Sequence, residues 1–202
     1  MRSFPGQVGL GFGVITEDAV ITPPEPTSQI PFIVAKQTLR EMLARSSTFQ
    51  TAIEATGTTS QKIAAAKLRI YLSAYISDTL ERPFAVICKN ESDKQNAIGG
   101  GDSTTFLPAG SLDLRLEKVI PDEFLTGTSP NQKLTEGSEG DAEEDFEDFY
   151  EGCLADINAL AGKSGYLFIR GWDTIEGPSL FESAGAQQNV YMIRKLCNWG
   201  IE

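Results

Sequence analysis

The side chains that could do chemistry in this chain are three cysteines, a dense group of acids and two tryptophans. The 202 residues include no histidine, which excludes Ser-His-Asp and Cys-His catalysis, histidine zinc ligands and the commonest general base. Cys88, Cys153 and Cys197 are too widely spaced for a CxxC metal pair and odd in number for a complete disulfide framework. This cysteine usage predicts a reducing compartment.

Each cysteine and tryptophan also has a structural interpretation. Cys88 lies within an apolar run and Cys153 on the apolar face of an expected helix, where a thiol usually acts as a small core residue. The environment of Cys197 stays open. Trp172 and Trp199 could stack a ligand, but large aromatic residues near sheet ends more commonly fill the core or a subunit contact.

Pairs of carboxylates are the next candidates. Asp145 and Asp148 would share one face of a helix, and Asp113 and Glu117 would share the wet face of a strand. Carboxylates without an apolar pocket stay ionised and solvated, so neither pair predicts acid-base catalysis.

Nine acids lie within the sixteen residues 136–151, which contain no lysine or arginine. A calcium site, a charged wall facing an anion and a solvated helix start are the three interpretations. Neither Asp141 nor Asp145 opens the D-x-[DN]-x-[DN]-G series of an EF-hand. The favoured interpretation is that these acids complement the positive end of a helix macrodipole.

A glycine-rich run at residues 9–13 resembles a phosphate-binding loop only superficially. Such a loop opens a helix after a buried strand, whereas here the proline-rich segment TEDAVITPPEP follows. The sequence therefore predicts no catalytic residue, no cofactor and no metal ligand, and the chain is not expected to be an enzyme. A small hydrolase that uses carboxylates and a metal is the alternative from another functional class.

Composition sets broader bounds. With 41% hydrophobic and 22% charged residues, the chain fits one globular domain that buries roughly 70% of its unfolded surface. A formal net charge of −11 repels the phosphate backbone, so nucleic-acid binding is not expected. The chain has no run of 18 apolar residues and begins without an apolar signal region, so we expect a soluble protein with no membrane association.

The elements that would position these side chains follow from periodicity. Glycines and prolines through residue 31 predict an extended N-terminal arm, 1–31, ahead of a single domain, 32–202. Apolar residues at helical spacing predict a helix over 31–45. Capping-box patterns at residues 47–50 and 58–61 predict a short second helix and a third that runs to about residue 76.

Strands are expected after Pro83. The apolar run 84–88 and the alternating run 112–117 predict an antiparallel hairpin, 84–119, with a long polar loop between them. A linker rich in Gly, Ser and Thr follows through about residue 140 and is either functional or disordered.

The last third of the chain is expected to hold one helix and two strands. An amphipathic helix follows the linker, with acids in its first turns and apolar residues over 146–160 on one face. It ends at Gly162 or Gly165 and leads to a strand at 166–170 that extends towards Ile175. A polar loop over 177–188 precedes a final strand. The order predicts an α+β fold, with an antiparallel or mixed sheet of four to five strands flanked by helices.

Several runs of this chain resemble small tail-completion and neck proteins of tailed bacteriophages: residues 39–50, 66–71, 82–87, 171–172, 177–178 and 199–200. The element order is similar to that of the tail terminator family, whose fold is a mixed sheet flanked by helices. The resemblance covers residues 32–200 in pattern and order, and it includes no catalytic signature. The N-terminal arm and the acidic run depart from the family.

The resemblance implies a structural virion protein of the phage neck. It would form a hexameric ring that caps the finished tail tube, stops tube polymerisation and offers a surface to the head connector. Its partners would be copies of itself, the tail tube protein, the head-tail connector protein and, as a further candidate, the tail sheath. The genome would pass through the ring without sequence-specific binding, in the virion, after assembly in the host cytoplasm. Another head-tail joining or tail-tube structural protein is the alternative.

Two groups of side chains are candidates for roles in that ring. Residues of the arm and of the first long loop would contact neighbouring subunits or the tube: Phe12, Val14, Ile15, Asn96, Ile98 and Thr104. Acids of the acidic run would face the channel, because an acidic lining does not grip DNA: Glu143, Glu144, Asp145 and Asp148.

Overall fold

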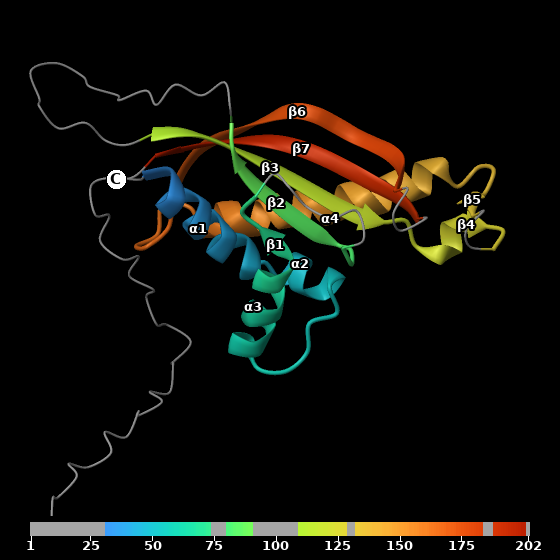
Figure 1. Ribbon diagram of the computed structural model, residues 1–202, viewed down its shortest axis with the longest axis horizontal. Helices are drawn as coiled ribbons and strands as arrows, with labels where there is room; N and C mark the ends of the chain where they lie inside the picture. The colour runs from blue at the N-terminus through green and yellow to red at the C-terminus, as the bar shows by residue number, and fades with distance from the viewer. Residues whose placement is uncertain (1–30, 74–79, 91–108, 129–131, 184–187, 201–202) are drawn as a thin grey trace, which may run out of the picture.

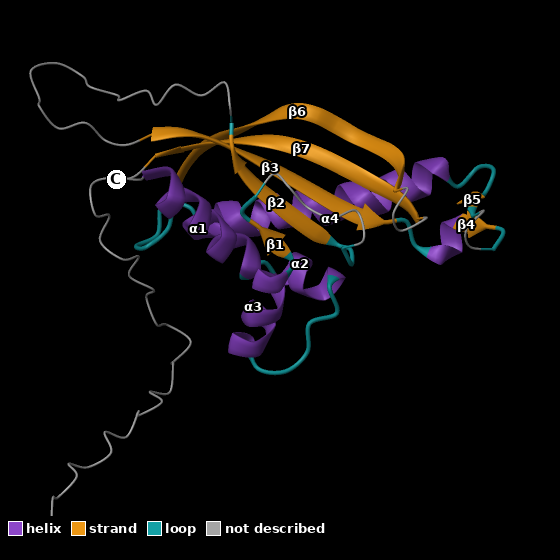
Figure 2. Cartoon of the chain, in the orientation of Figure 1, coloured by secondary structure: helices purple, strands orange, loops and turns teal. Residues whose placement is uncertain are grey.

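The computed structural model of the chain describes residues 31–73, 80–90, 109–128, 132–183 and 188–200 (Figure 1). These residues form a five-stranded mixed sheet, a separate two-stranded sheet and four α-helices, which confirms the predicted α+β class (Figure 2). The helices are α1 (Pro31–Ala44), α2 (Ser47–Ala52), α3 (Thr59–Leu68) and α4 (Glu139–Leu160). The strands of the main sheet are β1 (Ile70–Tyr71), β2 (Phe84–Lys89), β3 (Ala109–Val119), β6 (Phe168–Ser183) and β7 (Gln188–Gly200).

Two of the helices begin at side-chain caps. The capping box predicted for α3 is confirmed, because the backbone N–H of Thr58 donates to Gln61 Oε1 at 2.8 Å while the Thr58 hydroxyl caps the first turn. The box predicted at 47–50 is wrong by one residue. Ser46 is the N-cap of α2, and its Oγ accepts from the backbone N–H of Phe49 at 3.1 Å.

The third helix is shorter than predicted. It ends at Leu68, and Ile70 and Tyr71 form the short strand β1 in place of helix through residue 76. β1 runs parallel to β2, with Ile70 opposite Ala85. A β-branched residue followed by an aromatic one fits a pleated sheet better than a helix, and pairing with β2 decides the outcome.

The strand order of the main sheet is β1-β2-β3-β7-β6. The predicted hairpin is confirmed, because β2 and β3 pair antiparallel with Ile87 opposite Leu114. The final strand is also confirmed as β7, which lies between β3 and β6. The predicted polar loop over 177–188 is wrong in its first part, since β6 continues to Ser183 through three register shifts.

The stretch after Pro121 is more ordered than the linker that was predicted. It holds a 3-10 turn, η1 (Asp122–Phe124), and two short strands, β4 (Leu125–Thr126) and β5 (Lys133–Leu134), which pair antiparallel. Leu125 and Leu134 face each other across this pair and pack partly buried against the core.

The core lies between one face of the sheet and the helices. Alternate residues of β3, namely Leu112, Leu114 and Leu116, are fully buried there together with side chains of all four helices. Aromatic contacts join the two layers: the rings of Phe146 and Tyr191 stack 5.4 Å apart, and Phe32 meets Trp199 edge-on at 5.7 Å. Each such buried side chain contributes about 1.5 to 3 kcal/mol.

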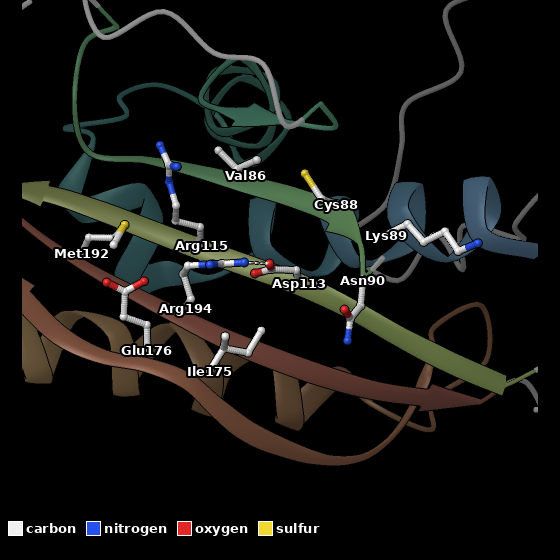
Figure 3. Close-up of a pocket in the computed structure, with 10 residues that line it drawn as sticks. All are labelled: Val86, Cys88, Lys89, Asn90, Asp113, Arg115, Ile175, Glu176, Met192 and Arg194. Carbon is white, nitrogen blue, oxygen red and sulfur yellow. Dashed lines mark hydrogen bonds and ion pairs between the residues drawn. The ribbon is translucent and has the colours of Figure 1, made fainter. Parts of the chain in front are cut away.

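The opposite face of the sheet carries the other residues of the same strands. The helices α1 and α4 lie behind the sheet when it is viewed from this side (Figure 3). We call it the open face.

Candidate functional site

A groove of about 690 Å³ crosses the open face (Figure 3). Four neighbouring strands and the residue after β2 supply its walls: Val86, Cys88, Lys89, Asn90, Asp113, Arg115, Ile175, Glu176, Met192 and Arg194. Two arginines and two acids carry its charge, Arg115, Arg194, Asp113 and Glu176, because the Nζ of Lys89 lies over the Phe32 ring of α1 at 4.8 Å. The charges of the groove lining are therefore balanced.

Strand register places the charged residues. Arg115 stands opposite Val86 on one side and opposite Arg194 on the other, and Glu176 pairs with Arg194. The register of β6 shifts between Thr174 and Glu176, which leaves Ile175 as an extra residue. A bulge of this kind re-aims a side chain, and Ile175 is part of the groove lining.

Both arginines of the groove form ion pairs with acids of β3. Arg194 pairs with Asp113, and this hydrogen bond together with the nearby charge raises the pKa of the Arg194 guanidinium. Arg115 pairs with Glu117. The side chains of Arg115 and Arg194 are about one-third exposed, at 31% and 38%.

Glu117 corrects a sequence prediction. It was expected on a wet strand face, but it is fully buried and accepts a hydrogen bond from Arg82 Nε at 2.9 Å. The Arg82 side chain is itself only 2% exposed. The charged residues that alternate along β3 suggested a strand face in contact with water. Instead, Arg82 and Arg115 neutralise Glu117 within the protein.

Cys88 lies in the groove with its side chain half-buried. Burial raises the pKa of its thiol, and the nearby Asp113 carboxylate raises it further. A thiol held in its neutral form is a poor nucleophile, so the groove is not arranged for cysteine chemistry. The prediction that Cys88 is a core residue is thus only partly right.

The other two cysteines are core residues. Cys153 is buried on α4, as predicted, and burial raises the pKa of its thiol to about 12. Cys197, whose environment the sequence left open, is buried on β7, and burial raises its thiol pKa as well.

The tryptophans have structural roles. Trp199 is 1% exposed in the core. Trp172 Nε1 donates to Asn158 Oδ1 of α4 at 2.9 Å. Neither ring lies in the groove lining.

The candidate channel acids lie in the first turns of α4. Glu143, Glu144 and Asp148 are exposed. Asp145 is partly buried and pairs with Lys118 at 2.7 Å, so its charge is balanced within the chain. Asp145 and Asp148 also line a second cavity of about 390 Å³ against α2. Acids occupy the first turn of α4, where the positive end of the helix macrodipole favours them. That any of these acids faces a channel stays a prediction.

A third feature is the edge formed by β6. Three of its large apolar side chains are exposed: Phe168 at 41%, Ile175 at 44% and Leu180 at 45%. β6 has 16 residues and ends the strand order, whereas β1 at the other end has two. An edge strand of this length is a template for pairing with another chain.

The remaining candidates lie outside the described residues: Phe12, Val14, Ile15, Asn96, Ile98 and Thr104. Sequence reasoning missed the groove, although Asp113, Arg115 and Glu117 alternating on β3 were its signal. The residues opposite them on β7 are more than about 70 positions away in the sequence, and only the strand order brings them together.

Among the residues that the structure places, no group of three or more acids or cysteines lies close enough to hold a metal ion. The described helices include none that is long and apolar enough to cross a membrane.

No protein-family model matches this sequence. A search of curated proteins found no significant relative.

Proposed function

We propose that this protein is a structural subunit of the neck of a tailed bacteriophage, a tail terminator whose ring caps the tail tube and presents a surface to the head connector. The proposal starts from the resemblance in sequence pattern and element order. The observation that carries it further is the edge strand β6 with its exposed Phe168, Ile175 and Leu180.

A closed ring needs two different surfaces on each subunit, because every copy must contact both of its neighbours. The two edges of this sheet differ in that way: β6 is long with exposed apolar side chains, and β1 is short with α3 packed beside it (Figure 1). Burying one large apolar side chain in a contact is worth about 1.5 to 3 kcal/mol, so three of them are enough to matter for association.

The register shifts in β6 limit how a neighbour can pair with it. They divide the strand into short regular stretches, such as Gly171 to Thr174, and Pro178 adds a position without an N–H. Irregular edges resist open-ended strand addition. A contact of defined size, as in a ring, is consistent with such an edge.

The exposed acids of α4 support a channel that does not retain DNA. Glu143, Glu144 and Asp148 add negative charge on one helix, and an acidic surface repels the phosphate backbone. Under this proposal the genome passes the ring without binding it. Another head-tail joining or tail-tube protein is the alternative structural role, and no observation in the described residues favours a metal-dependent hydrolase.

The test is the oligomeric mass of two matched variants, measured by light scattering on a sizing column. Leu180→Glu places a charge on the β6 edge. The protein concentration needed for ring assembly should then rise at least tenfold, so smaller species replace the ring. Ile33→Glu is the control, because Ile33 is an apolar residue that is 42% exposed on α1, which belongs to neither edge of the sheet. Equal behaviour of both variants and the parent chain would contradict the use of β6 as a subunit contact.

A further inference from the structure

We propose that residues 8–14 of the N-terminal arm of a neighbouring copy of this chain add to the β6 edge as a sixth strand of the main sheet. The inference rests on the assembly function proposed above and names the segment that pairs with the β6 contact. An edge strand presents N–H and C=O groups that an extended segment of another chain can satisfy, so backbone hydrogen bonds would add to apolar burial.

The first observation is the pattern of the arm sequence. Residues 8–14 read Val-Gly-Leu-Gly-Phe-Gly-Val, so apolar residues alternate strictly with glycines. Because successive side chains of a strand point to opposite faces, this segment as a strand would have one apolar face and one bare face. Glycine weakens a strand that stands alone, so we expect the strand to form when the segment pairs with an existing sheet.

The β6 edge has an apolar face to which this pattern is complementary. Trp172 stands opposite Cys197 of β7. Leu180 stands opposite Tyr191, and both of these β7 residues belong to the core on the helix side of the sheet. Trp172 and Leu180 therefore lie on that side, where Trp172 is partly buried and Leu180 is 45% exposed. An added strand with its apolar residues on the helix side would extend the core past β6.

The lengths of the two segments agree. The β7 residues opposite Leu180 and Trp172 are six positions apart, which corresponds to about 20 Å along an antiparallel strand. The ends of residues 8–14 are also six positions apart and span the same length when extended. One arm segment can therefore cover the edge from Trp172 to Leu180, which gives the contact a defined size.

The irregular backbone of β6 gives the glycines a purpose. The register of β6 shifts between Thr174 and Glu176 and again before Ser179, so a regular strand follows this edge poorly. Ile175 is 44% exposed in the groove lining on the open face, where the bare face of the arm strand would lie. Glycine adopts the backbone conformations that bulges need, and it has no side chain to meet that of Ile175.

The linker between residues 8–14 and the domain favours a neighbouring copy. Phe32, near the start of α1, contacts Trp199, which stands opposite Ile169 of β6, so a short linker would reach the chain's own β6 edge. Instead, the linker comprises residues 15–30 and includes three prolines. At about 3.1 Å per residue it reaches about 50 Å, whereas a domain of about 170 residues is about 40 Å across. It is therefore long enough to cross to an adjacent subunit.

Hydrogen exchange of the full chain tests the added strand directly. Amides of residues 8–14 should exchange about tenfold more slowly, or slower still, in the assembled protein than in the dilute monomer, because pairing with β6 engages them in hydrogen bonds. Residues 1–4 are the internal reference and should exchange equally in both. Phe12→Asp should abolish the protection. Phe4→Asp, the same substitution outside the alternating run, should keep it.

A mixture of two variants tests whether the arm comes from another copy. The Phe12→Asp chain has an intact β6 edge, and the Leu180→Glu chain has an intact arm. Each variant alone should need about tenfold more protein to assemble, since each lacks one side of the contact. Mixed in equal amounts, they should form pairs of two chains, because the arm of the Leu180→Glu chain can still dock on the edge of the Phe12→Asp chain.

Two results would overturn the inference. One is fast exchange of residues 8–14 in the assembled protein. The other is protection of these residues at every protein concentration without pairs in the mixture, which would place the arm on its own β6 edge.

Oligomeric mass separates failure of this inference from failure of the proposed function. Closed rings with an unprotected arm would overturn the inference and leave the function standing. Protected arms in dimers or open chains, together with pairs in the mixture, would support the inference and contradict the ring. A parent chain that stays monomeric at every concentration with residues 8–14 unprotected would overturn both.

Discussion

The two faces of the main sheet are built from the same strands and differ in almost everything else. On the covered face, Leu112, Leu114 and Leu116 of β3 are buried against helices. On the open face, Asp113, Arg115 and Glu117 of the same strand hold ion pairs around a groove. The comparison teaches that one alternating strand can supply a core on one side and a charged, partly buried surface on the other.

The largest effect is expected from Glu117→Gln, which removes the buried charge of the open face. Arg82 would stay buried and lose its ion pair with Glu117, and breaking a buried ion pair costs about 3 to 5 kcal/mol. Urea unfolding followed by circular dichroism measures this loss in the free energy of unfolding. A loss below about 1 kcal/mol, the size typical of solvated pairs, would show that the open face is merely a wet surface.

A comparable loss is expected on the covered face from Leu114→Ala. Leu114 is fully buried, and the lost contacts together with the cavity left behind cost about 2 to 5 kcal/mol. The matched control is Leu68→Ala, since Leu68 is mostly exposed. If both leucine variants unfold at the same urea concentration, the covered face is not the main core.

A third prediction concerns the hydrogen bonds that join α4 to the start of α2. Asp156 on α4 accepts hydrogen bonds from Ser46 Oγ at 2.8 Å and from the backbone N–H of Thr48 at 3.1 Å, at the start of α2. Burial opposes ionisation of Asp156, but these bonds and those of the Ser47 and Thr48 hydroxyls outweigh it and hold its pKa below the usual value. Loss of such a cap costs about 0.5 to 2 kcal/mol.

The pH dependence of Asp156→Asn follows from that depressed pKa. The carboxylate stabilises the fold above its unfolded pKa, and this contribution is lost as pH falls through the lower folded pKa. The variant should therefore unfold more easily than the parent at pH 7, with the difference shrinking under acid conditions. A difference that grows on acidification would contradict the role of the ionised form.

The smallest perturbation is thiol labelling, which compares the faces without any mutation. Cys88 opens into the groove, while Cys153 and Cys197 are fully buried on the covered side. One thiol per native chain should react with Ellman's reagent, slowly because burial raises the Cys88 pKa, and three should react after unfolding. Mass spectrometry of the labelled peptide identifies the residue, and first labelling at Cys153 would reverse the assignment of the two faces.

Local pattern was enough to predict much of the covered face. The spacing of apolar residues predicted α1 and α4, and the alternation in β3 predicted which leucines face the core. It failed at Ile70 and Tyr71, where pairing with β2 outweighs helix continuation, and at residues 177–183, where a bulged strand has the composition of a loop. In each case a distant partner strand decides the local structure.

The open face could not be predicted because its contacts are long-range. The pairs Arg82 with Glu117 and Arg194 with Asp113 join residues 35 and 81 positions apart. Charge alternation in one strand looks the same whether water or another strand neutralises it. The resemblance to phage neck proteins rests on sequence pattern and on the order of helices and strands. It did not predict where on the sheet the groove lies.

The most direct test of the assembly role is native mass spectrometry of the full chain, with negative-stain images of the same sample, alone and mixed with tail tubes. The proposed function predicts closed rings of about six copies, formed alone or on the tube tip. A monomer at every concentration that neither forms rings nor binds tubes would contradict it.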